Sequence, residues 1–533
     1  MNNEEIADAL KLTAQLMELH NENPFKVKSL LAASFRIDKL DRELEQVPFE
    51  ELESIDGIGK SLASKIQELN TIGTTKELQV LLEKTPIGVI EMLGIKGIGP
   101  KKVQLLWKQL ELETVGELLY ACNENRLVDL KGFGEKTQEL VRKAIEFKLA
   151  SNGFYHYAKA EVVALQLMDF LQKKYAPRHL SITGALRRKC ELVEKIEILT
   201  TVPSVDISEF INDAGIPIEI ITCSEFEFTT RLFQTTGSVD HLAKLNFDSA
   251  VNYDSEEAIY KEHSFSFIEP ELREGRNELE LSSNKKLPRL IEPSDLKGIL
   301  HNHSKYSDGQ NTLKEMAVYA KELGYEYLGI CDHSQSAFYA SGMKEDKIVA
   351  QHQEIEQLNK ELYPFKIFKG VESDILNDGN LDYPEEILKS FDFIVASVHS
   401  NLKMNEEKAT ARLIKAIENP YTTILGHPTG RLLLSREGYP IDHKKIIDAC
   451  AANGIIMELN AHPYRLDIDW RWIPYCLEKG VKISINPDAH KTSGYHDMYY
   501  GCCVARKGML SKEMCFNAHS RAEIEAHFLA RKK

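Results

Sequence analysis

The spacing of hydrophobic positions changes twice along the 533 residues of the chain. Up to about residue 150, apolar residues recur every three or four positions between short loops that contain Gly or Pro, which predicts helices throughout. Between 151 and 267, one helix-patterned stretch precedes several short apolar runs, which predicts a mixed α+β region. From 293 onward, apolar runs of strand length alternate with helix-patterned segments, which predicts a parallel sheet.

These changes of pattern predict a multidomain protein, as expected for a chain of this length. Residues 268–292 are charged, contain Pro and lack periodicity, which predicts a linker. The predicted segments are two helical domains, an α+β domain, the linker and an α/β domain, at 1–80, 81–150, 151–267, 268–292 and 293–533.

A Gly-hydrophobe-Gly turn occurs three times in the helical part, each time between two apolar helical runs. The copies are Gly57-Ile58-Gly59-Lys60, Gly97-Ile98-Gly99-Pro100-Lys101 and Gly132-Phe133-Gly134. Such a turn lets backbone NH groups approach a DNA phosphate closely, and Lys60 and Lys101 add positive charge. One copy alone could be an ordinary helix end. Three copies within about 80 residues predict helix-hairpin-helix elements that bind DNA without reading its sequence.

Ligand-type residues follow six of the seven strand-length runs in the last part of the chain. Because the carboxyl ends of parallel strands meet at one mouth of a barrel, these side chains are expected to converge. A single His or Asp there could be a turn or cap residue, whereas the whole set predicts a metal site. The candidate ligands are His301, His303, Asp308, His333, Glu372, His399, His427, Asp488 and His490.

The donor types of this set indicate which ions are expected. Imidazole and carboxylate ligands without thiolate favour Zn²⁺, Mn²⁺ or Fe²⁺, and nine candidates exceed the roughly four ligands of one ion. Two or three divalent ions are therefore expected. Clustered divalent ions are typical of enzymes that cleave phosphate esters.

The amino-acid composition restricts the binding partners and the compartment that can be expected. The chain has 66 Lys+Arg and 81 Asp+Glu, a net charge of −15, which argues against a surface that is basic all over. Residues 51–150 hold 14 Lys/Arg and 15 Asp/Glu, so DNA contact is expected on this nearly neutral helical part. The absence of any run of about 18 apolar residues argues against membrane insertion, and nine cysteines without a CxxC pair suit a reducing cytoplasm.

The last 240 or so residues resemble the PHP (polymerase and histidinol phosphatase) domain. The motifs that carry the resemblance are His301-Asn302-His303, Asp332-His333-Ser334, Gly370-Val371-Glu372, Gly426-His427-Pro428 and Asp488-Ala489-His490. The resemblance implies a distorted seven-stranded barrel with a trinuclear site, in which Glu372 binds two of the ions.

Residues 1–290 resemble a family X DNA polymerase, and together with the PHP-like part they have the layout of the bacterial PolX type. The motifs are Asn23-Pro24-Phe25-Lys26-Val27, Thr183-Gly184-Ala185-Leu186-Arg187-Arg188 and Thr236-Gly237-Ser238. The resemblance implies a lyase-like domain and helix-hairpin-helix fingers up to residue 150, then a nucleotidyltransferase-like palm and thumb. It also matches Lys65 to the Schiff-base lysine of deoxyribose-phosphate lyases. A solvated lysine that contacts DNA phosphate is the alternative.

The metal-binding positions of the palm depart from the family pattern. Where the family has three Asp residues, this chain has Lys195, Glu197 and Glu219. A cation repels a divalent ion, and Glu is one methylene longer than Asp in a site with strict distances of about 2.0–2.1 Å. The sequence therefore predicts a degenerate palm that does not hold Mg²⁺ and adds little or no nucleotide.

Arg431 and Arg465 lie just past strand ends and are candidate phosphate contacts, with capping or surface arginines as the alternative. Taken together, the sequence predicts a bacterial, cytoplasmic, DNA-binding, metal-dependent phosphodiesterase. It is expected to act as a 3′→5′ exonuclease in DNA repair, on gapped, nicked or 3′-recessed DNA and with other base-excision repair proteins. The alternatives are an active family X polymerase with exonuclease, a small-molecule phosphatase of the PHP family and a non-catalytic DNA-binding scaffold.

Overall fold

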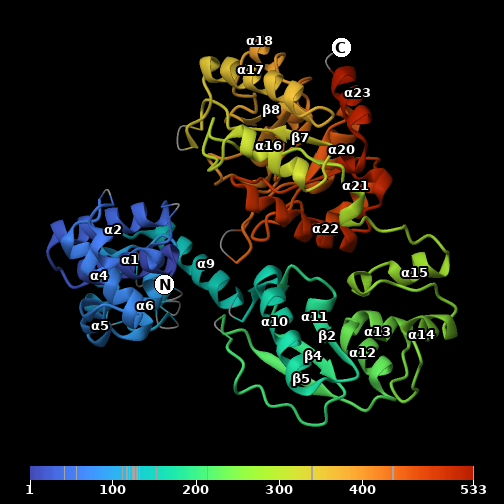
Figure 1. The fold of residues 1–533 in the computed structure, drawn as a ribbon, viewed down its shortest axis with the longest axis horizontal. Helices are drawn as coiled ribbons and strands as arrows, with labels where there is room; N and C mark the ends of the chain where they lie inside the picture. Colours follow the sequence, from blue (N-terminus) through green and yellow to red (C-terminus); the bar gives the residue numbers. More distant parts are fainter. Residues whose placement is uncertain are drawn as a thin grey trace. The chain divides into compact units, whose positions relative to one another are not determined.

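The computed structural model forms two compact units, Met1–Asn152 and Gly153–Lys533 (Figure 1). It describes the chain from residue 1 to 531, with gaps at 41, 56, 111, 116–117, 119–120, 123–126, 128–129, 131, 152, 213, 338–339 and 435–436. Within the described residues, each helix is too short or too polar to cross a membrane.

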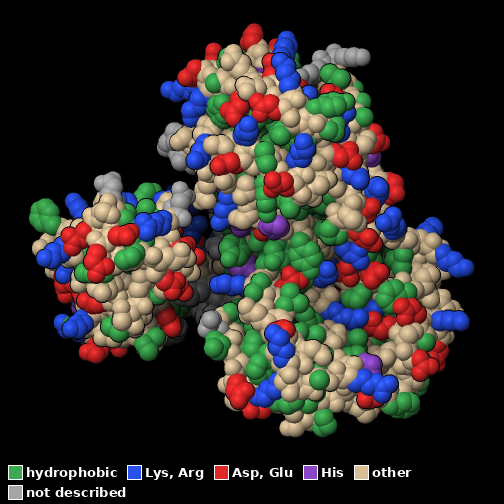
Figure 2. All heavy atoms as spheres, in the orientation of Figure 1, with side chains coloured by type: hydrophobic (Ala, Val, Ile, Leu, Met, Phe, Trp, Pro, Cys, Tyr) green, Lys and Arg blue, Asp and Glu red, His purple; other side chains and the backbone are tan. Residues whose placement is uncertain are grey.

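The first unit is helical, as the spacing of its apolar residues predicts. Its core is formed by one side of each helix, beginning with Ile6, Leu10 and Met17, which are almost completely buried. On the face shown in Figure 2, positive and negative side chains are interspersed on this unit. The helices are α1 (Asn3–Leu19), α2 (Pro24–Asp38), α3 (Phe49–Leu52), α4 (Lys60–Ile72), α5 (Lys76–Glu83), α6 (Ile87–Leu93), α7 (Pro100–Gln109) and α9 (Glu135–Ser151).

The three glycine turns precede helices α4, α7 and α9. Gly57, Gly97 and Gly132 have φ of +84°, +96° and +85°, which is the left-handed region that favours glycine. Gly59 and Gly99 are the N-caps of α4 and α7, and neither helix start carries a side-chain cap. The first NH groups of these helices are therefore left for another acceptor, as a phosphate-binding turn requires.

The second unit begins with two small sheets. β1 (Tyr155–His156) pairs antiparallel with β3 (Leu192–Val193). The three-stranded sheet has the order β2-β4-β5, from β2 (Leu180–Thr183), β4 (Ile196–Thr200) and β5 (Ile218–Thr222). Around them lie α10 (Tyr157–Tyr175), α11 (Gly184–Arg187), α12 (Phe228–Thr236), α13 (Val239–Leu245) and α14 (Glu256–Glu262).

Residues 268–292, predicted as a linker, fold into the second unit instead. They contain η2 (Pro270–Leu272) and α15 (Glu278–Ser283). Arg273 is fully buried, donates to Glu256 at 2.6 Å and lies over the ring of Phe233. The charged residues of this segment favoured an exposed linker. Arg273 can be buried because Glu256 pairs with its charge.

The rest of the second unit is the seven-stranded barrel, and the fold class is confirmed. All neighbouring strands are parallel, in the order β12-β11-β10-β9-β8-β7-β6. The two ends of the sheet are joined by the parallel bridge of Asn302 to Ala489 and by a bond of 3.2 Å from Leu300 N to Asn486 Oδ1. The strands are β6 (Gly298–Ile299), β7 (Tyr327–Ile330), β8 (Lys366–Asp374), β9 (Phe393–Ser397), β10 (Ile424–Leu425), β11 (Ile456–Asn460) and β12 (Ile483–Asn486).

Helices cover the outside of this barrel, and a continuous apolar cluster packs between the helices and the strands. The covering helices are α16 (Leu313–Glu322), α17 (Glu345–Glu361), α18 (Glu385–Leu388), α19 (Glu406–Ile417), α20 (His443–Asn453), α21 (Ile473–Glu478), α22 (Met498–Lys507) and α23 (Arg521–Arg531). Since the strands are parallel, their carboxyl ends all open at one mouth, where the predicted ligands lie.

Candidate metal centre and nucleic-acid interface

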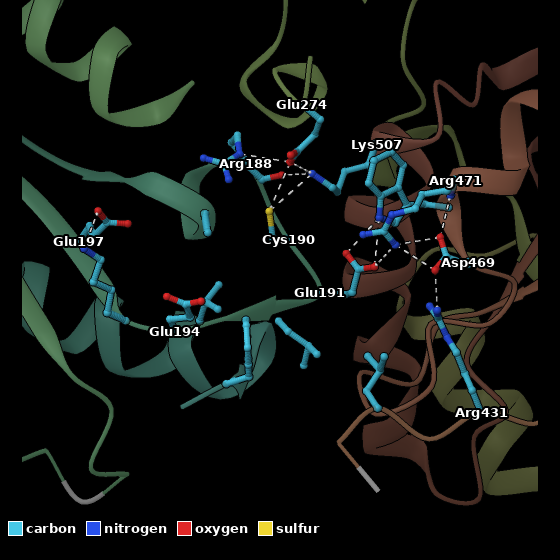
Figure 3. A pocket seen from close by; sticks show the side chains of 17 residues that line it. Arg188, Cys190, Glu191, Glu194, Glu197, Glu274, Arg431, Asp469, Arg471 and Lys507 are labelled. Atoms are coloured by element: carbon cyan, nitrogen blue, oxygen red, sulfur yellow. Dashed lines mark hydrogen bonds and ion pairs between the residues drawn. The ribbon is translucent and has the colours of Figure 1, made fainter. Parts of the chain in front are cut away.

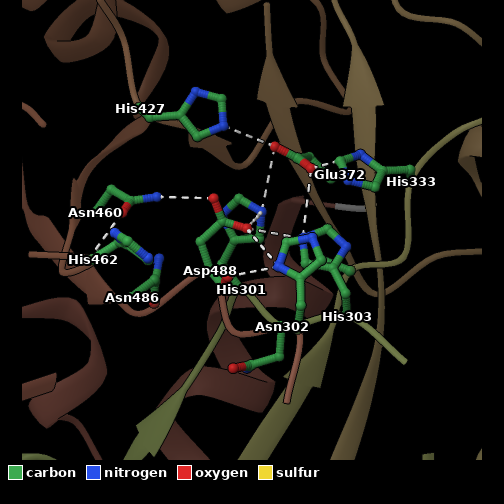
Figure 4. Close-up of polar contacts among 12 residues, drawn as sticks. His301, Asn302, His303, His333, Glu372, His427, Asn460, His462, Asn486 and Asp488 are labelled. Atoms are coloured by element: carbon green, nitrogen blue, oxygen red, sulfur yellow. Dashed lines mark hydrogen bonds and ion pairs between the residues drawn. The ribbon is translucent and has the colours of Figure 1, made fainter. Parts of the chain in front are cut away.

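Glu372 lies at the centre of the predicted ligand set. It is fully buried on β8, and its Oε1 is 3.1 Å from His399 Nε2, 3.0 Å from His427 Nε2 and 3.3 Å from His301 Nε2. Its Oε2 is 2.9 Å from His333 Nδ1 (Figure 4). One carboxylate thus brings together imidazoles that follow four other strands.

Two aspartates connect the remaining ligands to this centre. Asp488 Oδ1 is 3.0 Å from His303 Nε2 and 3.6 Å from His301 Nε2. Asp308 Oδ1 is 3.3 Å from His490 Nε2. Asp488 has φ of +53°, a left-handed conformation that a non-glycine residue adopts at some cost, as at many functional sites.

The donor atoms of this site fit divalent metal ions. His301 Nε2, His303 Nδ1 and Glu372 Oε2 are buried and make no hydrogen bond among the described residues. The distances given above from His301 Nε2 and Glu372 Oε2 are close approaches without hydrogen-bond geometry. Buried polar atoms are normally paired, and a cation satisfies such a set of facing nitrogen and oxygen atoms. Three groups have ligand atoms within 4.8 Å of one another: His303, Asp308, His333 and His490; His301, His303 and Asp488; and His333, Glu372 and His399.

Electrostatics keep the carboxylates of this site ionised, whereas its histidines are shifted in both directions. Burial would raise the pKa of Glu372, but His399 and His301 hold it well below its usual range. The pKa of Asp488 is likewise lowered by His301 in spite of burial. Burial and the neighbouring His490 lower the pKa of His303 to about 3. Neighbouring carboxylates, Glu372 among them, act against burial to raise the pKa of His301 well above its usual range and that of His399 to about 10. Metal binding at this site must therefore release protons from these two rings.

Three residues that the sequence reasoning missed support the ligands. Glu458, fully buried on β11, accepts from His301 Nδ1 at 2.7 Å, and Asp374 accepts from His399 Nδ1 at 2.5 Å. Asn460 donates to Asp488 Oδ2 at 3.1 Å. The available signal was a carboxylate inside an apolar strand, as in Met457-Glu458-Leu459.

The two candidate phosphate arginines lie in different surroundings. Arg431 donates to Arg465 O at 3.0 Å and to Asp469 Oδ2 at 2.8 Å, and it also contacts Leu466 O. These contacts favour the capping alternative for Arg431. Arg465 Nε lies 3.9 Å from Asp488 Oδ2, next to the metal centre, and its phosphate role stays a prediction.

In the palm, Lys195 lies between the two glutamates. Its Nζ contacts Glu219 and is 3.4 Å from Glu197 Oε1. Glu197 and Glu219 are paired residues of the parallel strands β4 and β5. The bond to Glu219 raises the pKa of Lys195, which stays a cation at the place where the resemblance puts a metal ion.

The residues predicted to bind DNA belong to the first unit. Lys60 and Lys101 are exposed at the starts of α4 and α7, with 84% of the Lys101 side chain accessible. Lys65 is only 15% exposed and is paired with Glu77, which also binds Lys26. Bonds from both lysines lower the pKa of Glu77, although its burial works the other way.

The fold and the site together define a class of protein, one that joins helix-hairpin-helix elements to a PHP barrel with a divalent-metal site. Family models match accordingly: a helix-hairpin-helix domain at 1–75, a SAM-like helix-hairpin-helix tandem at 89–146 and a PHP domain at 300–462. The whole chain is 32% identical to the DNA polymerase/3′-5′ exonuclease PolX of Bacillus subtilis (strain 168), over an alignment that covers 100% of both chains. The protein belongs to the PolX family.

Other relatives match the barrel alone. A probable phosphatase of Acetivibrio thermocellus is 30% identical over 199 residues, which cover 36% of this chain and 78% of that protein. Among solved structures, a histidinol phosphate phosphatase from Lactococcus lactis covers 40% of this chain and 93% of its own, with 19% identity and a TM-score of 0.33. A likeness of that size supports no inference about metal or substrate.

Proposed function

We propose that the protein is a metal-dependent 3′→5′ exonuclease that acts on DNA. The observation that carries the proposal is the convergence of nine His, Asp and Glu side chains at one barrel mouth, with buried ligand atoms that lack a hydrogen-bond partner among the described residues. The helix-hairpin-helix unit supplies the DNA binding, and the similarity to a PolX exonuclease along the entire chain supports the 3′→5′ direction.

The proposed ligand sets follow the PHP resemblance. They would hold three ions, two of which share Glu372. Glu372 would bridge two ions, with His301, His303 and Asp488 on one side and His399 and His427 on the other. Asp308, His333 and His490 would hold the third. Zn²⁺ and Mn²⁺ fit these donors, as does Fe²⁺. When bound, such ions lower the pKa of a coordinated water and neutralise the phosphoryl oxygens.

Residues around the metal ligands orient the ligands and contact the substrate. Glu458 and Asp374 accept from the Nδ1 atoms of His301 and His399, which fixes both rings with Nε2 towards Glu372. Arg465, close to Asp488, is the group we assign to the phosphate that is cleaved. Burial of Glu372 and of four histidine ligands strengthens the electrostatic interactions among them; these histidines are His301, His303, His333 and His427.

The test is degradation of a 5′-labelled, 3′-recessed duplex with Mn²⁺. We expect stepwise shortening from the 3′ end by the wild type and none by His301→Ala or Asp488→Ala. Undiminished degradation by either variant would place the activity elsewhere.

A second function, a small-molecule phosphatase, is favoured by one observation, the probable phosphatases that match the barrel alone. Phosphomonoesters and a 3′-recessed duplex, tested on the same preparation, separate the two. Faster turnover of a phosphomonoester, with no shortening of DNA, supports the phosphatase.

The palm is proposed to be inactive because the ammonium of Lys195 already lies between Glu219 and Glu197, where it would repel a divalent ion. Mg²⁺-dependent primer extension by the wild type would contradict this.

A lyase role for Lys65 is tested by borohydride trapping on abasic DNA, with Lys65→Ala as the control. If the wild type forms no adduct, the protein is not a lyase. We place the protein in the bacterial cytoplasm, acting on gapped or nicked DNA beside other base-excision repair proteins.

A further inference from the structure

The small sheet of β1 and β3 lies against the barrel and not only against the palm. A cavity of about 620 Å³ within the second unit is lined on one side by palm residues that include Cys190, Glu191 and Glu194, and on the other by barrel residues (Figure 3). The barrel side comes from the loops after β10 and β11 and from α22, and includes Arg431, Asp469, Trp470 and Lys507. The loop after β11 is the one that carries Arg465.

Glu191, next to β3, contacts the barrel across this cavity, as does Lys507 of α22, which donates to Arg188 O at 2.9 Å. The Glu191 side chain is 10% exposed and accepts from Trp470 Nε1 at 3.0 and 3.1 Å and from Arg471 Nη1 at 2.8 Å. His156 on β1 adds a bond of 3.1 Å to Leu433 O. A buried carboxylate with two strong donors from one short segment holds that segment in one place.

A chain of contacts connects this anchor to the metal centre. Asp469 accepts from Arg471 Nη1 at 2.9 Å and from Arg431 Nη1 at 2.8 Å. Arg431 in turn donates to the backbone oxygen of Arg465 at 3.0 Å. Arg465 then lies 3.9 Å from Asp488. The segment from 461 to 471 is thus fixed at its far end by Glu191 and at its middle by Arg431.

We propose that Glu191 is a positioning residue for the phosphodiesterase centre. It holds the 461–471 loop against the barrel so that Arg465 stays beside Asp488 and meets the scissile phosphate. The inference rests on the proposed function of the metal site, and it gives the degenerate palm a role that needs no metal of its own. A side chain of the former polymerase part thereby supports catalysis in the barrel.

The experiment compares Glu191→Ala with Glu194→Ala in the full-length protein. Glu194 lines the same cavity, and no described contact joins it to the 461–471 loop. For Glu191→Ala we expect amide hydrogen exchange in the loop to become about tenfold faster, since its anchor is lost. We also expect kcat to fall about 10- to 100-fold, the size of effect that a misplaced group causes. Glu194→Ala should change neither.

The readouts separate positioning from general damage. The loss in kcat should be equal on 3′-recessed DNA and on bis(p-nitrophenyl) phosphate, with KM, DNA affinity and bound Mn²⁺ unchanged. Glu191→Gln keeps an acceptor for Trp470 and should recover part of the rate. If Glu191→Ala does not fold, Trp470→Phe removes one of the two donors from the other side and keeps that of Arg471, so it should loosen the loop in the same way but less.

Two results would overturn the inference: wild-type exchange in the 461–471 loop of Glu191→Ala, or an unchanged kcat on both substrates. Should the wild type cleave neither substrate, the proposed function fails by itself. The exchange comparison of Glu191→Ala with Glu194→Ala still decides whether the palm side holds the loop.

Discussion

Glu458→Gln tests whether the buried partner of a histidine ligand controls metal affinity. The carboxylate accepts three bonds, from His301 Nδ1 and His427 N at 2.7 Å and from Asn486 Nδ2 at 3.0 Å. Glutamine has one acceptor oxygen, so its NH₂ must face one of these donors. An unpaired buried donor costs about 1–3 kcal/mol of folding stability. Loss of the partner of a ligating histidine typically weakens metal binding about 10- to 100-fold, or about 1.4–2.8 kcal/mol.

The chain offers a matched control in Glu278→Gln. Glu278 is equally buried and also accepts three bonds, from His241 Nδ1 at 2.7 Å, from Gly275 N at 2.8 Å and from Arg276 N at 2.7 Å. Its helix packs through Leu279 and Leu281 on an apolar cluster that is separate from the barrel core. We therefore expect a similar loss of stability and no change in metal binding.

The assay is equilibrium dialysis against Mn²⁺ with metal analysis, and urea denaturation of the same samples. Glu458→Gln should need about 10- to 100-fold more Mn²⁺ for half-maximal binding, whereas Glu278→Gln should match the wild type. Wild-type Mn²⁺ affinity in Glu458→Gln, together with a stability loss equal to that of the control, would refute the reasoning.

Three further predictions concern other parts of the chain. Lys60→Ala and Lys101→Ala should each weaken binding to all DNA sequences alike, and each should lower the slope of log affinity against log salt by about 1. Fluorescence anisotropy measures both quantities, and an unchanged slope would count against phosphate contact. Burial raises the pKa of Glu256, but Arg187 and Arg273 outweigh burial and lower this pKa from 4.5 to about 2. The ionised carboxylate therefore contributes up to about 3 kcal/mol to folding stability above pH 4.5, and this contribution is lost as the pH falls towards 2. The difference in unfolding free energy between the wild type and Glu256→Gln should therefore narrow on acidification, and a constant difference would contradict this. Lys195→Met leaves Glu197 and Glu219 without their cation, so thermal denaturation should show a loss of stability of up to about 1 kcal/mol that millimolar Mg²⁺ reverses. A loss that Mg²⁺ does not alter would contradict the view that Lys195 occupies the place of a metal ion.

Sequence predicts well those parts of the site whose structure is determined by neighbouring residues in the chain. Gly57, Gly97 and Gly132 occupy left-handed positions that few other residues adopt, so their spacing reports the turn directly. Seven of the nine ligands follow strand ends, Glu372 lies near the end of β8 and Asp308 lies in a loop, and the geometry of a parallel barrel brings strand ends together. This is why a one-dimensional pattern predicts a three-dimensional cluster.

The parts that sequence does not predict depend on contacts between distant segments. Glu458 and Asp374 lie on strands and look like isolated polar residues until the histidines that they bind are in place. Glu191 and Trp470 are 279 residues apart, and neither belongs to a motif. The segment 268–292 reads as solvated because its buried cation Arg273 has a partner that only the fold supplies.

The most direct test of the account is the digestion of a 5′-labelled, 3′-recessed duplex in Mn²⁺, with metal content measured on the same preparation. The account predicts a ladder that shortens one nucleotide at a time from the 3′ end in the wild type. It predicts no ladder for Asp488→Ala. A ladder that persists in Asp488→Ala, or a metal-loaded wild type that leaves the duplex intact, would contradict it.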